Sequence, residues 1–146
     1  MKIFLAAPFK NKIKNGELEK EYIELLLLIK RTLESFDSSV HLAIEREKWG
    51  KEFWSDEACT NKDYEEIKSS DIVVALFDET FSGGIHIELG WASSMGKKIC
   101  VLKKKEEILC SLIKGLNSVT PCSILEFKDH NEMINKLKDQ ITKWKD

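Results

Sequence analysis

The stretch DIVVALF, residues 71–77, decides the fold of this chain. After its first aspartate it is a continuous apolar run rich in β-branched residues. Such a run is typical of a strand buried on both faces of a parallel sheet, because helices then cover both sides of it. Asp71 opens the run, and the favoured interpretation is structural, namely that it ends or caps the preceding helix. The sequence therefore predicts a central parallel strand at this point.

Strand-like and helix-like segments alternate five times along the chain. Four further segments read as strands: residues 2–9, 39–45, 98–104 and 123–127. Apolar residues recur at three and four positions between and after them, which predicts helices at 17–35, from about 63 to 70, at 85–95, at 106–116 and over 133–144. Gly96 is expected to stop the helix at 85–95. This alternation predicts an α/β fold, a doubly wound five-stranded parallel sheet of the Rossmann-like or flavodoxin-like kind.

Composition indicates one domain, residues 1–146, with a single core. The formal net charge of -2 gives no electrostatic reason to expect binding to nucleic acid or to a membrane surface. The longest apolar run, LLLLI at 25–29, is too short to span a bilayer, and a cytoplasmic protein is the expectation. The four cysteines lack metal-ligand spacing, so we expect reduced thiols and no metal.

In a sheet of this kind the ligand crevice lies beyond the carboxyl ends of the strands. If the first strand neighbours the strand at 71–77, the loops after Phe9 and Phe77 open onto the same crevice. Ser82, Gly83 and Gly84 then supply a hydroxyl group and an approachable backbone before a helix N-terminus, where free N–H groups favour an anion. The pattern is that of a phosphate cradle or, alternatively, of a flexible loop before a helix.

Two carboxylates are candidates for chemistry. Glu88 is expected on the first turn of the helix at 85–95, where it either complements the helix dipole or is kept ionised as a nucleophile. Asp63 either caps a helix or serves as a second carboxyl group for proton transfer. Paired carboxylates are what glycosyl transfer uses, since one attacks or stabilises the anomeric carbon and the other manages the proton.

The polar, aromatic segment at 46–63 shows no clean periodicity and is expected to be irregular. Its Trp49, Phe53 and Trp54 are either a hydrophobic cluster or a wall for a nucleobase, and Arg46 either reads a base or phosphate or decorates the loop. Lys10 is either a solvated lysine or a point charge for phosphate.

Four blocks in order resemble the nucleoside 2-deoxyribosyltransferase superfamily over residues 2 to 127. They are FLAAPF at 4–9, EREKWGKEF at 45–53, DYEEIKSSDI at 63–72 and SGGIHIELGWASSMGKK at 82–98. Within the superfamily the sequence is most similar to CMP and 5-hydroxymethyl-CMP N-glycosidases of the mildiomycin and bacimethrin type.

The resemblance implies roles for particular residues. Glu88 aligns with the nucleophile that attacks C1′ and forms a glycosyl-enzyme intermediate, and Asp63 with the aspartate that assists proton transfer. Ser82, Gly84 and Lys10 fall at the phosphate, although a lysine lacks the bidentate fork of the arginine that relatives often carry. The remaining candidates are Phe4 and Phe9, which leave room for a ribose 2′-hydroxyl, and Arg46, Trp49 and Phe9 for the base.

The resulting expectation is hydrolysis of a pyrimidine ribonucleoside 5′-monophosphate, CMP or 5-hydroxymethyl-CMP, to free base and ribose 5-phosphate. No metal or organic cofactor is implied. Relatives complete the crevice with residues of a neighbouring subunit, which implies a homodimer with a shared active site. The alternatives are a 2′-deoxynucleotide N-glycosidase, a nucleoside deoxyribosyltransferase and a nucleotide-binding module without catalysis.

Overall fold

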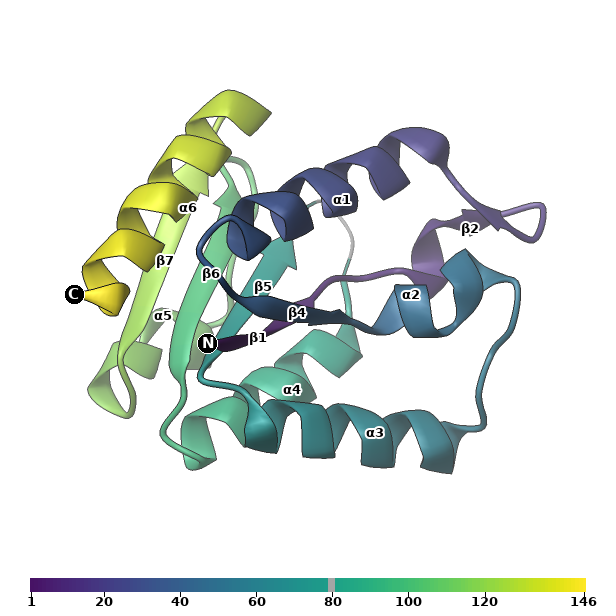
Figure 1. Cartoon of the computed structure of the whole chain (residues 1–146), viewed down its shortest axis with the longest axis horizontal. Helices are drawn as coiled ribbons and strands as arrows, with labels where there is room; N and C mark the ends of the chain where they lie inside the picture. The colour runs from purple at the N-terminus through teal and green to yellow at the C-terminus, as the bar shows by residue number, and fades with distance from the viewer. Residues whose placement is uncertain (79–80) are drawn as a thin grey trace.

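A five-stranded, all-parallel sheet forms the centre of the computed structural model, which describes residues 1–78 and 81–146 (Figure 1). Its strand order is β4-β1-β5-β6-β7. The bounds are Lys2–Ala6 for β1, Ser39–Leu42 for β4, Ile72–Phe77 for β5, Lys98–Lys104 for β6 and Cys122–Phe127 for β7. The predicted fold class and the central place of the run at 71–77 are confirmed, and every residue of β5 is buried.

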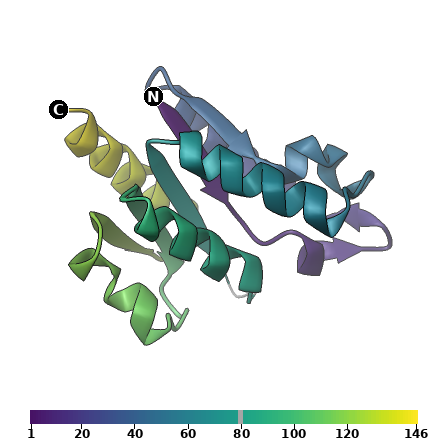
Figure 2. The same cartoon turned by 90° about the horizontal axis from the view of Figure 1, so that it is seen from below.

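Helices cover both faces of the sheet. On one face lie α1, Lys20–Glu34, and α6, His130–Lys145, and on the other lie α3, Asp56–Ser69, and α4, Gly83–Ser94, followed by the short α5, Ser111–Lys114 (Figures 1 and 2). Alternate residues of the strands feed two separate cores: Ile3 and Leu5 point toward α1 and α6, whereas Phe4 and Ala6 point toward α3 and α4.

The chain changes direction across the sheet between β1 and β5. From β1 it passes through α1 to β4 at one edge, and it then returns through α3 to β5 on the other side of β1. The carboxyl ends of β1 and β5 therefore diverge into loops that leave a space between them, the usual ligand position in such sheets. At the other end, Asp71 accepts a hydrogen bond from the Lys2 backbone N–H at 2.8 Å, a structural role, although Ser70 rather than Asp71 ends α3.

Two segments are more ordered than the sequence analysis predicted. The loop after β1 contains a 3-10 turn, Lys10–Lys12, and a small hairpin made of β2, Ile13–Lys14, and β3, Glu17–Leu18. Asn15 and Gly16 form its turn with φ angles of 53° and 77°. The segment at 46–63, predicted to be irregular, holds a 3-10 turn at Lys48–Gly50 and the first two turns of α3, which Ser55 caps through the Ala58 N–H. The strand predicted at 39–45 ends at Leu42, and α2, Ala43–Arg46, takes the place of its last residues.

Other boundaries differ less. Gly96 adopts φ +67° after α4, which confirms it as the C-terminal stop. The helix predicted at 106–116 shrinks to α5 and a 3-10 turn, Leu116–Ser118. The loop predicted between β5 and α4 includes positions 79 and 80, which lie outside the described residues. No helix within residues 1–78 and 81–146 is long and apolar enough to cross a membrane.

Candidate active site

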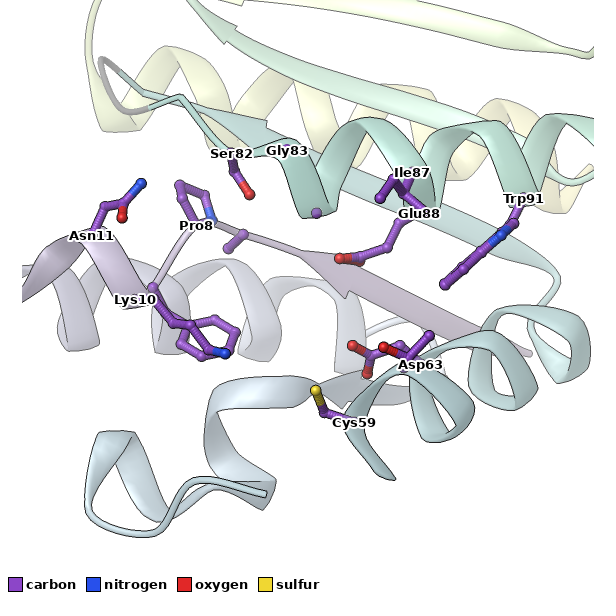
Figure 3. Close-up of a pocket in the computed structure, with 14 residues that line it drawn as sticks. Pro8, Lys10, Asn11, Cys59, Asp63, Ser82, Gly83, Ile87, Glu88 and Trp91 are labelled. Atoms are coloured by element: carbon purple, nitrogen blue, oxygen red, sulfur yellow. The ribbon is translucent and has the colours of Figure 1, made fainter. Parts of the chain in front are cut away.

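A pocket of about 400 Å³ opens between the loop after β1, the inner face of α3 and the start of α4 (Figure 3). It lies at the position that the strand order predicts, beside the carboxyl end of β1. The three segments contribute residues that are up to about eighty positions apart in the sequence: Ala7, Pro8, Phe9, Lys10 and Asn11 from the loop, Cys59, Thr60 and Asp63 from α3, and Ser82, Gly83, Gly84, Ile87, Glu88 and Trp91 from the α4 region.

The start of α4 forms one wall of the pocket. The Ser82 hydroxyl caps the helix by accepting a hydrogen bond from the Ile85 N–H at 3.3 Å. The side-chain amide of Asn11 donates to the Phe81 carbonyl at 3.0 Å and so ties the loop after β1 to this helix start. Gly84 has no side chain to occupy the space between Ser82 and Glu88. A Cβ atom at this position would lie 3.7 Å from both the Ser82 hydroxyl and a Glu88 carboxyl oxygen. The wall therefore presents helix N–H groups to the pocket without a covering side chain.

Glu88 points from α4 into the pocket toward Asp63 (Figure 3). Burial of its carboxyl group and the nearby Asp63 carboxylate raise the pKa of Glu88 to about 8, while Arg46 opposes this rise. The expectation that the helix dipole keeps Glu88 ionised is therefore wrong for the free protein. The physical reason is position: α4 begins at Gly83, so Glu88 lies in its second turn, beyond the first turn in which the dipole acts strongly.

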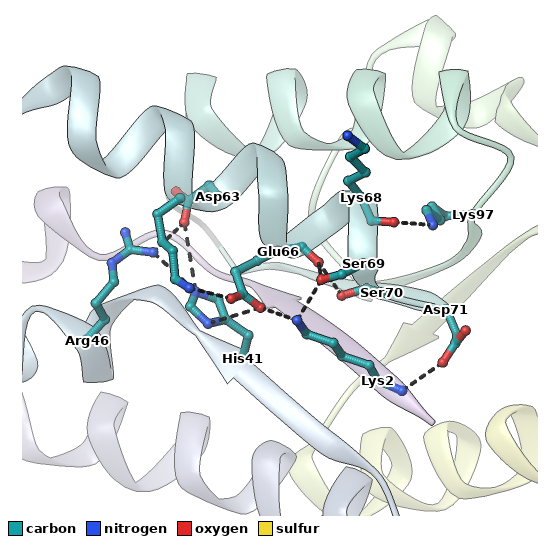
Figure 4. A network of polar contacts seen from close by, with 11 residues as sticks. Lys2, His41, Arg46, Asp63, Glu66, Lys68, Ser69, Ser70, Asp71 and Lys97 are labelled. Carbon is teal, nitrogen blue, oxygen red and sulfur yellow. Dashed lines mark hydrogen bonds and ion pairs between the residues drawn. The ribbon is translucent and has the colours of Figure 1, made fainter.

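Asp63 sits in the middle of α3 and does not cap a helix, because Ser55 holds that place. Its Oδ1 accepts a hydrogen bond from Arg46 Nη1 at 2.8 Å (Figure 4). Arg46 is mostly buried, stacks on the Trp54 ring at 4.7 Å and does not line the pocket. The prediction that Arg46 contacts the substrate is therefore not supported, and its geometry is that of a partner that orients Asp63.

Lys10 and Phe9 line the pocket mouth, as the sequence analysis predicted. The Lys10 ammonium group lies 5.8 Å from the centroid of the half-exposed Phe53 ring. The Lys10 side chain lines the pocket opposite the start of α4, and its ammonium group points away from Ser82 (Figure 3). A cation at the mouth and a helix N-terminus in the wall make this side of the pocket attractive to an anion.

Two predicted contact residues lie away from the pocket. Phe4 is 1% exposed, belongs to the core under α3 and α4, and stacks on His41 with ring centroids 5.5 Å apart. As a residue in the middle of β1 it is covered by α3, so it does not contact a ligand in this pocket. Trp49 packs against the opposite core. Neither residue lines the pocket, so the sugar and base selection assigned to them stays a prediction without support from this geometry.

Several pocket residues were missed by the sequence analysis. Cys59, Thr60 and Asp63 share one helix face through three- and four-residue spacing, and so do Gly84, Ile87, Glu88 and Trp91. With Asp63 and Glu88 placed on helices, this spacing would have predicted which residues of the same helices also line the pocket. Trp91 also joins the two helices, because its ring meets Tyr64 edge-on at 5.3 Å.

The pocket lies at the point where the chain changes direction across the sheet and pairs two carboxyl groups, an arrangement suited to glycosyl-group chemistry. The model of the nucleoside 2-deoxyribosyltransferase family matches residues 3–139. The chain belongs to this family. The resemblance noted from the four sequence blocks is thereby confirmed.

Solved structures agree with this assignment. The chain is 30% identical to the CMP N-glycosidase BcmB of Clostridium botulinum, with a TM-score of 0.76, and the match covers 96% of this chain and 99% of that one. It is 27% identical to BlsM, with a TM-score of 0.77 and coverage of 99% and 93%. A conserved protein from Enterococcus faecalis V583 is 16% identical with a TM-score of 0.65, over 95% and 98%, and shares the fold. A comparison with curated protein sequences found no match.

Proposed function

We propose that this protein hydrolyses the N-glycosidic bond of a pyrimidine ribonucleoside 5′-monophosphate, CMP or 5-hydroxymethyl-CMP. The observation that carries the proposal is the placement of Glu88 opposite Asp63 in a pocket whose wall begins with the N-terminus of α4. The likeness to a CMP N-glycosidase over almost the whole of both chains supports the same substrate class.

The phosphate is assigned to the start of α4. Ser82 and Gly84 offer a hydroxyl group and uncovered backbone N–H groups, and Lys10 lines the same pocket from the loop after β1. Anchoring the phosphate here places the sugar deeper in the pocket, toward the two carboxyl groups. An anion bound at a helix N-terminus needs no metal, because the free backbone N–H groups hold it.

The chemistry is assigned to the carboxyl pair. Ionised Glu88 attacks C1′, the C1′–N bond breaks with its electron pair going to the base, and the base takes up a proton that Asp63 relays from water. Water then attacks C1′ of the glycosyl-enzyme, giving ribose 5-phosphate and free Glu88. Because the pKa of Glu88 in the free protein is about 8, only a minority of the molecules carry the nucleophile at neutral pH.

The test is to incubate the protein with CMP, 5-hydroxymethyl-CMP, dCMP and cytidine separately and to follow free base by chromatography. We expect release from the ribonucleotides, little from cytidine, and none with Glu88→Ala or Glu88→Gln. Full activity of a folded Glu88→Ala protein would refute the assignment of the nucleophile.

The preference for ribose over deoxyribose is tested by comparing CMP with dCMP as substrates. Because Phe4 does not reach the pocket, the preference for ribose rests on the likeness to the CMP N-glycosidase alone. Faster release from dCMP would assign a 2′-deoxynucleotide N-glycosidase with the same mechanism. Formation of a new nucleoside when a second base is added would instead assign a deoxyribosyltransferase.

We also propose that the active form is a homodimer that shares its site. Two large apolar side chains near the pocket stay in water in the single chain: Phe81 is 75% exposed and Ile87 is 57% exposed. Ile87 lines the pocket itself, so a second subunit covering it would also narrow the opening. Light scattering coupled to size-exclusion chromatography tests this, with Ile87→Glu expected to shift the protein to a monomer.

A further inference from the structure

Few contacts determine where the guanidinium group of Arg46 points. Nη1 lies 2.8 Å from Asp63 Oδ1 and 3.2 Å from His41 Nε2, and the group stacks on Trp54 at 4.7 Å. Among the described residues, the buried Nε and Nη2 atoms have no hydrogen-bond partner. Arg46 Nη1 contacts both Asp63 and His41. The contact with His41 therefore helps to determine how the guanidinium group is oriented toward Asp63.

The contact between Arg46 Nη1 and His41 Nε2 determines which nitrogen of the His41 ring carries the proton. Arginine Nη1 carries two N–H groups and no available lone pair, so it donates to His41 Nε2. An Nε2 that accepts carries no proton, which leaves the single proton of the neutral ring on Nδ1. His41 Nδ1 faces Glu66 Oε2 at 3.7 Å (Figure 4). The ring lies flat against Phe4 with an interplanar angle of 19°.

Charged groups on two elements face His41. From α3 these are Asp63, Glu66 and Lys62, and from α2 it is Arg46, while β1 offers the Phe4 ring. Burial lowers the pKa of His41 more than any other influence; Glu66 and Asp63 oppose it, and Arg46 and Lys62 add to it.

Glu66 is ionised beside the neutral ring. Burial alone would raise the pKa of Glu66, but ion pairs with Lys2 at 2.7 Å and Lys62 at 2.6 Å hold it at about 2. The ring proton on Nδ1 therefore points toward a carboxylate that is charged throughout the neutral range.

We propose that His41 is a positioning residue for catalysis. As the neutral Nδ1–H tautomer it accepts one Nη1 hydrogen of Arg46, which directs the other Nη1 hydrogen to Asp63 and fixes that carboxylate opposite Glu88. The proposal rests on the proposed function and deepens it, because it assigns the correct placement of the proton-transfer group to a residue outside the pocket.

The first measurement needs no substrate. Long-range ¹H–¹⁵N NMR spectra at pH 7 report the tautomer of each histidine, and His86→Gln and His130→Gln variants assign the signals. We expect His41 to be neutral with its proton on Nδ1. A proton on Nε2, or on both nitrogens, would overturn the proposal.

The second measurement compares three variants by kcat and KM. Glutamine can place an amide oxygen near the position of Nε2, asparagine reaches only the position of Nδ1, and phenylalanine keeps the stacking without an acceptor. We expect His41→Gln to keep kcat within about threefold, whereas His41→Phe and His41→Asn lower it about tenfold or more at nearly unchanged KM, a fraction of the ~10²–10⁴-fold that proton transfer contributes.

A double-mutant cycle separates positioning from general support of the fold. In an Asp63→Asn background we expect His41→Phe to change kcat less than twofold, because the group that His41 places is already lost. An equal penalty in both backgrounds, or equal losses in folded His41→Gln and His41→Phe, would overturn the proposal. If His41→Phe does not fold, His41→Asn takes its place. A wild-type protein that hydrolyses none of the nucleotides would refute the proposed function, whereas the wrong tautomer would refute the role of His41 alone.

Discussion

Replacing Glu88 by glutamine removes a carboxyl group that the folded protein holds in its neutral form. The pKa of Glu88 rises from an ordinary 4.5 to about 8 on folding. Below pH 4.5 the group is protonated in both the folded and the unfolded chain and has no net effect on stability. Between pH 4.5 and 8 only the folded chain binds the proton, so the free energy of unfolding of the wild-type protein falls as the pH rises.

The size of this effect follows from the two pKa values. At ~1.4 kcal/mol for each pH unit, the rise to about 8 corresponds to about 5 kcal/mol at most. We therefore expect Glu88→Gln to gain up to about 5 kcal/mol where the wild-type carboxyl group is ionised. For a chain of this length a gain of that size raises Tm by about 10 to 20 °C.

Urea unfolding at pH 5, 6.5 and 8 checks the prediction. Glu88→Gln should be nearly as stable as the wild-type protein at pH 5 and more stable by the full amount at pH 8, while it no longer hydrolyses substrate. Glu65→Gln, an exposed glutamate on α3, is the matched control and should change stability by less than about 0.5 kcal/mol at each pH. A gain that is the same at pH 5 and pH 8 would refute the reasoning, because it would not come from the titration of Glu88.

Three further predictions follow from single positions. In the wild-type protein kcat/KM should rise about tenfold per pH unit and level off above about pH 8, where Glu88 is ionised; a flat profile between pH 6 and 8 would contradict this. Gly84→Ala places a methyl group 3.7 Å from Glu88 and Ser82, so the KM for CMP should rise about tenfold while the fold keeps its stability, as kinetics and thermal unfolding can show. Gly96→Ala, at φ +67° and away from the pocket, should cost about 1 kcal/mol of stability and leave kcat unchanged.

The sheet could be predicted because its strands and most of its helices bury apolar residues in regular patterns. The run at 71–77 forms β5 with every residue buried, and α1 and α6 show the apolar stripe that packs on the sheet. The first turns of α3 carry no such stripe. Only Ile67 of this helix is buried, since its inner face presents Cys59, Thr60 and Asp63 to the pocket. A helix that lines a polar pocket lacks the pattern by which helices are recognised.

The sequence analysis brought Glu88, Asp63 and the Ser82–Gly84 turn to one crevice, and all of them line the pocket, whereas the predicted contact residues around them line it only in part. Whether a strand residue faces a core or a pocket depends on where the covering helix lies, and α3 covers Phe4. Arg46 was read as a substrate contact because its partner, Asp63, is seventeen positions away and meets it only after α2 and α3 pack. The hairpin turn at Asn15 and Gly16 did have a local signal, since Asn-Gly favours the positive φ angles found there.

The pocket is assembled from segments that are distant in sequence and meet only around the β1–β5 junction. Ala7 and Glu88 lie about eighty positions apart, and every connection between the strands of the sheet is a long parallel crossover. Contacts of such large sequence separation form slowly, after the chain has met the entropy cost of closing long loops. No partly folded chain that lacks the β1–β5 pairing can hold a working site. During refolding from urea, the proposed hydrolysis is therefore expected to return no earlier than the completion of the sheet.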